Sequence, residues 1–194
     1  MGDQYPNCEV IGTDLSPIQP SWFPPNVKFE IDDCEQEWTF APDSFDFVHC
    51  RYMMGGVSDW PHLFRQAYTA LRPGGWLESF ECEADYRSDD GTIPPNSAMM
   101  TWSDLFREGG EKLGRPFNVI TENMQRKSME AAGFVDITVK NIKVPGREAL
   151  PISPHLTYHP HFSRCHEGGL LRIYMTLTGH PFRSLSALGR QIPS

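Results

Sequence analysis

Acidic side chains follow two segments that have the character of buried strands. The apolar run Cys8–Asp14 ends in Asp14, and the alternating segment Val27–Ile31 ends two residues before Asp33 and Cys34. In open α/β sheets, ligands bind beyond the carboxyl ends of the strands. A carboxylate at Asp14 can accept two hydrogen bonds from a ribose diol, while Asp33 and the Cys34 N–H can meet the edge of an adenine. Together the two acids indicate an adenosine pocket, although either acid alone is equally typical of a solvated loop.

The elements that would position these residues alternate along the chain. Apolar and alternating runs predict further strands, and apolar residues at helical spacing predict three helices. Asp59 is a suitable N-cap for the first helix, Thr121 for the third, and Gly133 is a suitable C-terminal residue for the third. Alternating strands and helices favour an α/β sheet with parallel crossovers. The further strands are expected at 45–50, 76–82 and 135–139, and the helices at 60–72, 97–113 and from 121 to 132.

Four segments resemble class I S-adenosylmethionine-dependent methyltransferases, in the order of that family. The resemblance covers about residues 5–145, and the four segments together are much more specific than any one of them. Glu9–Ser16 resembles the second strand, Phe45–Arg51 the fourth, Leu71–Leu77 the turn before the fifth, and Met129–Phe134 the approach to the sixth.

A narrower resemblance is to the fungal LaeA-like methyltransferases, which are described as regulators of secondary metabolism. It is carried by Asp14–Pro20 and by Phe29–Asp33. The resemblance implies a Rossmann-like sheet and S-adenosylmethionine as cofactor. It also implies the cofactor-binding residues: Asp14 with Leu15 at the ribose, Asp33 and Cys34 at the adenine, and Cys50 and Arg51 near the methionine end.

The N-terminal part of the sequence departs from this family pattern. Only 13 residues precede Asp14, and none of them fits the glycine-rich loop G-x-G-x-x-G. The expected fold is therefore an incomplete methyltransferase sheet that lacks the first, central strand and its loop. Residues 170–177 are the only candidate in the sequence for filling that gap.

Charge divides the chain near Pro145. The net charge of −8 separates into −11 for residues 1–145 and +3 for residues 146–194. We therefore expect a partial methyltransferase domain over 1–145 and an irregular, basic tail rich in proline and histidine over 146–194. The acidic balance argues against direct binding of nucleic acid or a membrane surface. The histidines of the tail are interpreted as part of this irregular segment rather than as metal ligands, so no metal site is expected.

The predicted function is methyl transfer to an acceptor that the sequence does not identify, with regulatory proteins as candidate partners. No catalytic residue is assigned, because the sulfonium is already activated and positioning supplies much of the rate. His49 and His62 are each more often structural than basic at such positions. The alternatives are a non-catalytic interaction module and an inactive fragment of such an enzyme. Five cysteines without a C-x-x-C pair predict reduced thiols and an intracellular location, in cytoplasm or nucleus.

Overall fold

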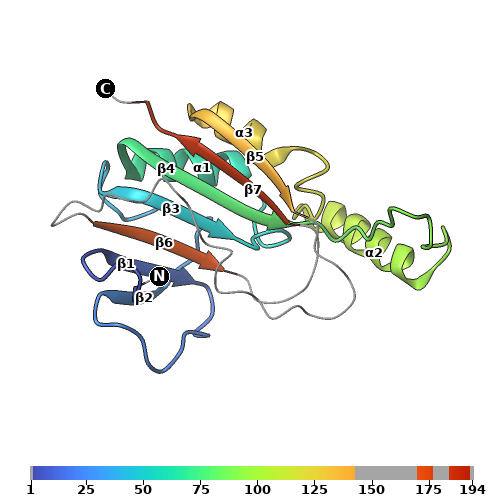
Figure 1. Cartoon of the computed structure of the whole chain (residues 1–194), viewed down its shortest axis with the longest axis horizontal. Coiled ribbons are helices and arrows are strands. Elements are labelled where there is room, and N and C mark those ends of the chain that lie inside the picture. Colours follow the sequence, from blue (N-terminus) through green and yellow to red (C-terminus); the bar gives the residue numbers. More distant parts are fainter. Residues whose placement is uncertain (1, 143–169, 177–183, 193–194) are drawn as a thin grey trace.

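A seven-stranded sheet forms the centre of the molecule in a computed structural model, which describes residues 2–142, 170–176 and 184–192. Six strands run in the same direction, and β7 is antiparallel to both of its neighbours, β4 and β5. The order across the sheet is β2-β1-β6-β3-β4-β7-β5 (Figure 1). The strands are β1 Glu9–Asp14, β2 Val27–Ile31, β3 Phe45–Arg51, β4 Leu71–Cys82, β5 Val135–Ile142, β6 Leu170–Thr176 and β7 Ser184–Arg190.

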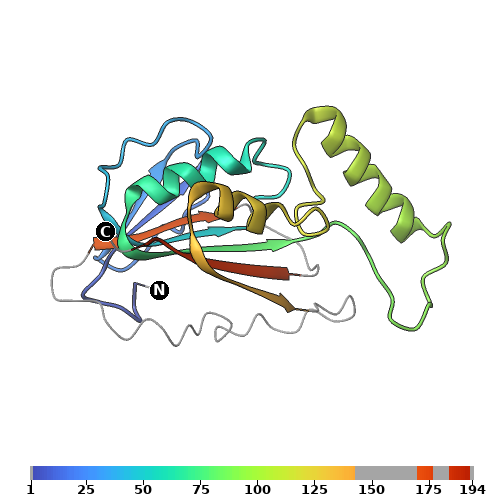
Figure 2. The same ribbon diagram turned by 90° about the horizontal axis from the view of Figure 1, so that it is seen from above.

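Helices α1 and α3 cover one face of this sheet, and α2 projects beyond its end (Figure 2). The bounds are α1 Trp60–Ala70, α2 Ala98–Leu113 and α3 Met124–Ala132. The buried core lies between the sheet and α1, with Trp60, Leu63, Phe64 and Ala67 contributed by the helix. The expected α/β architecture with a parallel sheet is confirmed.

Strand β6 occupies the place where the sequence lacks its first strand. It lies parallel between β1 and β3, pairing Ile11 with Ile173 and Val48 with Ile173 from its two sides. The gap predicted in the centre of the sheet is therefore filled, and by the one segment that the sequence offered. The strand order is therefore continuous across the sheet, and its central strand comes from late in the chain.

The expected tail over residues 146–194 is likewise not irregular throughout. Its segments 170–176 and 184–190 are strands β6 and β7 of the same sheet. Strand signals in this part of the sequence are weak because prolines punctuate it. The division of the chain at residue 145 stays a prediction, and the histidine group at 155–166 lies outside the described residues.

Two helix boundaries differ from the sequence prediction for identifiable reasons. The cap of α1 is as expected, because Asp59 Oδ1 accepts a hydrogen bond from the His62 N–H at 2.8 Å. The helix ends at Ala70 rather than 72, since Leu71 is extended and fully buried as the first residue of β4. The third helix begins at Met124 rather than at Thr121, whose N–H and hydroxyl both bind the buried carboxylate of Glu83.

Candidate functional site

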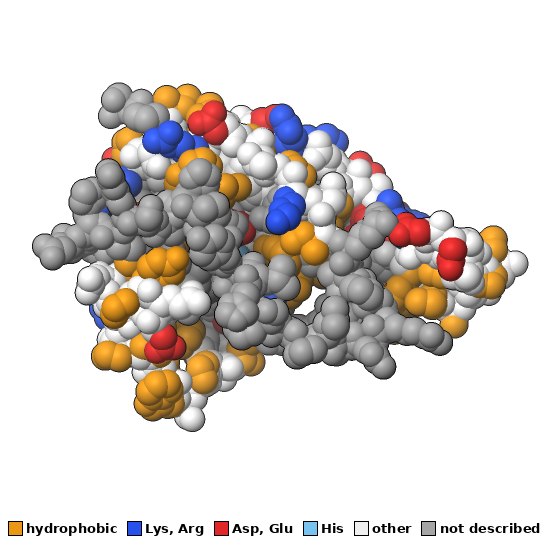
Figure 3. All heavy atoms as spheres, viewed as in Figure 1, with side chains coloured by type: hydrophobic (Ala, Val, Ile, Leu, Met, Phe, Trp, Pro, Cys, Tyr) orange, Lys and Arg blue, Asp and Glu red, His pale blue; other side chains and the backbone are white. Residues whose placement is uncertain are grey.

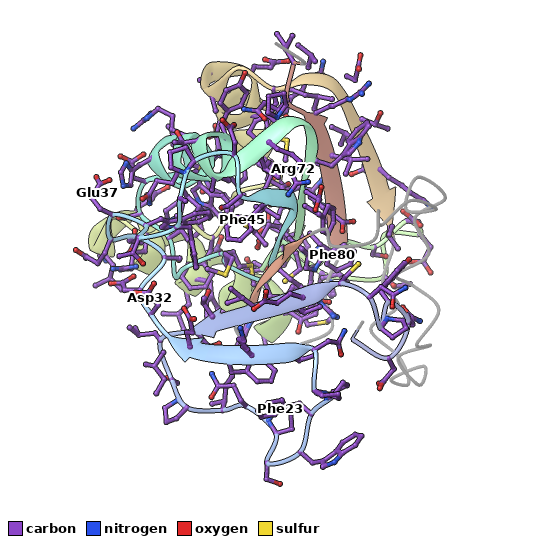
Figure 4. All side chains as sticks on the ribbon, turned by 90° about the vertical axis from the view of Figure 1, so that its left-hand side faces the viewer. Phe23, Asp32, Glu37, Phe45, Arg72 and Phe80 are labelled. Carbon is purple, nitrogen blue, oxygen red and sulfur yellow. The ribbon has the colours of Figure 1, made fainter. Side chains whose placement is uncertain are left out.

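The carboxyl ends of β1, β2 and β3 meet at one pocket of about 280 Å³. Because these strands are parallel members of one sheet, the residues that follow them gather at the same edge. Asp32, labelled in Figure 4, lies where β2 ends at this edge. The lining residues come from three strand ends and from the segment after α2: Thr13, Asp14, Leu15, Asp32, Asp33, Cys34, Glu35, Met53, Gly55, Gly56 and Arg115.

Asp14 lies at the end of β1 with one carboxylate oxygen still available. Its Oδ1 accepts a hydrogen bond from the Ser16 N–H at 2.8 Å, which fixes the turn that leaves the strand. Its backbone carbonyl accepts from the Asp32 N–H at 3.1 Å and ties the end of β1 to the end of β2. No residue of the described part of the chain bonds Oδ2. The geometry thus suits a carboxylate that accepts a hydrogen bond from a diol.

Asp33 and Cys34 form the opposite wall of the pocket, in a loop that hydrogen bonds hold in place. The Asp33 carboxylate accepts the Glu35 N–H at 3.0 Å, which closes a tight turn. The Cys34 carbonyl accepts the indole N–H of Trp38 at 3.1 Å and the side-chain amide of Gln66 at 3.4 Å. Because these two hydrogen bonds hold the Cys34 carbonyl, the orientation of the backbone at Cys34 is fixed at the pocket wall.

Gln66 of α1 is the anchor of this loop. Its side-chain oxygen accepts the Trp38 N–H at 2.7 Å, and its amide also donates to the Gln36 carbonyl at 3.0 Å. Gln66 is buried, so each of these loop groups would lack a partner without it. Sequence reasoning missed this residue, because a glutamine within an amphipathic helix carries no signal that distinguishes it from a solvated position.

The third wall of the pocket follows β3 and is held by the buried carboxyl group of Glu81. Glu81 accepts the Met53 N–H at 2.9 Å and the Met54 N–H at 3.0 Å. Gly55 has a φ of +69°, and the Phe117 ring occupies the space where a Cβ atom would stand. A side chain at this position would therefore be strained and would clash. These contacts fix the backbone that presents Met53, Gly55 and Gly56 to the pocket.

Arg115 and Glu35 join the outer rim. Arg115 Nη1 lies 2.8 Å from Glu35 Oε2 and also donates to the Gly56 carbonyl. Glu35 in addition accepts the Ser58 N–H at 2.6 Å. Partial burial would raise the pKa of Glu35, but the hydrogen bonds from Ser58 and Arg115 outweigh it and lower the pKa. The rim is thus an ion pair between the segment that follows β2 and the segment that follows α2.

The cysteine in this pocket, Cys34, is poorly suited to act as a nucleophile. Burial, followed by the neighbouring charges of Asp33 and Glu35, raises the pKa of the Cys34 thiol to about 12. A thiol with this pKa stays protonated near neutral pH and is a poor nucleophile. Among the described residues, Cys34, Cys50 and Cys82 are free thiols, as expected.

Four of the six predicted cofactor-binding residues line the pocket together: Asp14, Leu15, Asp33 and Cys34. The other two do not line it. Cys50 is fully buried in the core, and the Arg51 guanidinium packs over the rings of Tyr52 at 4.7 Å and Phe80 at 5.5 Å. The placement of Cys50 and Arg51 at the methionine end stays a prediction without support from the pocket.

The sequence reasoning missed the remaining lining residues of the pocket. Thr13, Asp32 and Glu35 adjoin residues that it singled out, so the strand-end rule would have found them if applied one residue more widely. Gly55 and Gly56 were not singled out as pocket residues. Arg115 had no signal at all, because it lies far along the chain from the other walls.

The histidines weighed as bases lie outside the pocket lining. His49 Nδ1 is 2.8 Å from Glu78 Oε2, and only 5% of the residue is exposed. His62 Nε2 is 3.8 Å from Glu37 in the first turn of α1. Both contacts fit the structural interpretation of these residues.

The comparisons with known proteins decide the family. The family model described as a methyltransferase domain matches residues 1–139. The chain belongs to this methyltransferase family. This domain is 45% identical over 146 residues to methyltransferase pytC of Aspergillus terreus, covering 75% of the chain and 44% of that protein. It is 40% identical over 157 residues to the secondary metabolism regulator LAE1 of Cochliobolus heterostrophus, covering 80% and 50%.

Solved structures agree on the fold. An S-adenosylmethionine-dependent methyltransferase from Methanosarcina mazei matches with a TM-score of 0.53 and 12% identity, covering 95% of this chain and 82% of that one. Another from Mesorhizobium loti matches with a TM-score of 0.51 and 17% identity, covering 93% and 80%. The sheet is therefore that of a class I methyltransferase. The methyltransferase domain described here spans about half the length of the curated relatives it matches, or less.

Proposed function

We propose that this methyltransferase domain binds S-adenosylmethionine in the pocket at the ends of β1, β2 and β3 and takes part in methyl transfer. The observation that carries the proposal is the pairing of Asp14 with the Asp33–Cys34 loop across one pocket. In this arrangement Asp14 holds the ribose diol, and the anchored Asp33–Cys34 peptide meets the adenine edge. The cofactor supplies a methyl group already activated on a sulfonium, so the contribution of the chain is binding and orientation.

The acceptor class and the biological role are also part of the proposal. One relative is named a secondary metabolism regulator, and another, laeA of Emericella nidulans, is named a protein-methionine methyltransferase. We propose a link to the regulation of secondary metabolism with protein partners, inside the cell. No helix among the described residues is long and apolar enough to cross a membrane.

Isothermal titration of S-adenosylmethionine into the purified chain tests the binding site. We expect saturable binding, and we expect Asp14→Ala to weaken it about tenfold or more, since charge-assisted hydrogen bonds to the ribose are lost. Asp3→Ala, which changes an exposed acid outside the pocket, is the matched control and leaves the affinity unchanged. Absence of heat with the unchanged, folded chain would contradict the proposal and favour the alternative of a non-catalytic interaction module.

A further inference from the structure

Strand β2 is an edge of the sheet and is unusually exposed for an apolar strand. It pairs with β1 on one side, and in the described sheet no strand lies on its other side. All of its residues after Val27 are exposed, including Phe29 at 37% and Ile31 at 64%. An open edge with apolar side chains is a template for pairing with another strand.

The ladder with β1 shows which backbone groups of β2 face outward. Val10 N–H donates to the Asn26 carbonyl at 2.8 Å before the ladder, and Asp32 N–H donates to the Asp14 carbonyl at 3.1 Å after it. Alternate residues of a parallel strand bond the same neighbour. The N–H and C=O groups of residues 28 and 30 therefore point toward β1, and those of residues 27, 29 and 31 point away from the sheet.

The outward backbone groups of Phe29 and Ile31 have no backbone hydrogen bond to another described residue beyond the strand ladder. Only the Val27 N–H is bonded locally, to the Pro24 carbonyl at 3.0 Å. The edge therefore retains donors and acceptors for a partner strand.

The loop between β1 and β2 adds apolar surface beside this edge. Trp22 is 77% exposed, and the Phe23 ring contacts the Phe29 ring edge-on at a centroid distance of 5.2 Å. Figure 4 places Phe23 on the loop beyond β2, on the side away from the rest of the sheet. Hydrophobic side chains gather over the β1–β2 end of the molecule in Figure 3. Exposed apolar patches of this kind are typical of interaction sites.

The sequence of β2 is complementary to itself when read in the opposite direction. Around a two-fold axis at Phe29, Lys28 faces Glu30 of a second copy and Glu30 faces its Lys28, while Val27 faces Ile31. The Phe29 residues of the two copies then form a hydrogen-bonded pair, and the Ile31 N–H of each copy donates to the Val27 carbonyl of the other, since the Val27 N–H is bonded to Pro24 of its own chain. The two charge pairs fall at the closer, non-hydrogen-bonded positions. We propose that two copies of this chain associate by antiparallel pairing of their β2 strands, which joins the two sheets into one.

The opposite edge of the sheet lacks these features. In β5 the register shifts between Val135 and Thr138, and Asp136 has a φ of +54°. Such an irregularity bends an edge strand and hinders pairing. The pairing of β2 with β1 has no register shift. Among the strands that the structure describes, the sheet thus has one irregular edge at β5 and one regular, unpaired edge at β2.

A charge-exchange experiment tests the pairing by sedimentation velocity of the full chain. We expect dimers for the unchanged chain, and an equilibrium shifted toward monomer about tenfold or more by Lys28→Glu or by Glu30→Lys, since each places like charges opposite each other twice. A mixture of the two single variants restores dimers as hetero-dimers, and the double variant Lys28→Glu/Glu30→Lys restores them alone. Restoration is the outcome that a merely destabilised fold would not show.

Two further variants serve as controls for the sedimentation experiment. Ile31→Pro removes an outward N–H that the ladder with β1 does not use, so the domain folds and the dimer is lost. Lys28 also forms an ion pair with Glu9 of its own chain, and Glu9→Gln removes that contact while leaving the dimer intact. A monomer at every soluble concentration, or dimers that Ile31→Pro and both charge reversals leave unchanged, would overturn the proposal. A monomer that instead captures an extended apolar peptide would show that this edge serves another partner.

Discussion

At the scale of single residues, buried polar side chains decide the shape of the pocket. Glu81 and Glu83 follow one another at alternate positions near the end of β4, and both are nearly fully buried. Glu81 holds the backbone at Met53 and Met54, and Glu83 holds Thr121. From the sequence alone we would expect both glutamates to face solvent, because glutamate is rarely buried. Their role follows only from the backbone groups that other segments bring to them.

Glu81 gives the stability of the domain a pH dependence. Burial raises the pKa of Glu81 from 4.5 to about 8, against the lowering effect of the Met53 and Met54 N–H groups. Between these values the folded state holds a proton that the unfolded chain has released, so stability falls as pH rises toward 8. We expect Glu81→Gln to flatten this decline, which is at most about 1.4 kcal/mol per pH unit.

Urea unfolding followed from pH 5 to pH 8.5 measures this effect. Glu122→Gln changes an exposed acid and is the matched control, with a profile parallel to that of the unchanged chain. Profiles for Glu81→Gln and the unchanged chain that stay parallel across the range would show that Glu81 does not hold this proton.

At the scale of elements, helix α1 both packs the core and positions the adenine side of the pocket. Its apolar face was predicted from helical spacing, and its cap from Asp59. The same helix carries Gln66, whose three hydrogen bonds hold the loop from Cys34 to Trp38. The packing of α1 and the geometry of the loop are therefore linked through one side chain.

Gln66→Leu separates these two roles of α1. Leucine keeps the packing volume but leaves the Trp38 N–H and the Gln36 carbonyl without partners, at a cost of about 1–3 kcal/mol for each group that stays buried. We expect faster amide exchange at Trp38 and weaker S-adenosylmethionine binding, with α1 still helical. Hydrogen exchange and calorimetry measure the two effects, with the exposed Gln4→Leu as control. Unchanged exchange at Trp38 would count against the anchoring role.

At the scale of the whole molecule, the late strand β6 makes the sheet continuous. It separates β1 from β3, which carry two of the three pocket walls, and it pairs with both. Strand β7 in the same way joins β4 to β5. The pocket therefore depends on a segment that contributes no described residue to its lining.

Removal of residues 146–194 tests this dependence. The chain 1–145 would lose β6 and β7, leaving β1, β3, β4 and β5 each without one ladder partner. Unpaired buried backbone groups cost about 1–3 kcal/mol each, so their sum exceeds the ~5–15 kcal/mol stability of a domain. We expect circular dichroism to show loss of cooperative unfolding. A cooperative transition for chain 1–145 similar to that of the full chain would contradict the role of β6.

The sequence by itself determined the class of fold, the order of most elements and four residues of the pocket. It did so because periodicity, caps and strand-end acids are local properties, and because Asp14 and Asp33 follow strands that the apolar pattern reveals. Only the tertiary structure decided that β6 fills the centre of the sheet, that Arg115 closes the rim and that Gln66 and Glu81 hold the walls. These are contacts between segments distant in sequence, and each depends on which neighbour a backbone group meets. The edge at β2 depends on both kinds of information. Its self-complementary residues can be read from the sequence, but only the tertiary structure shows that the strand lies exposed at the edge of the sheet.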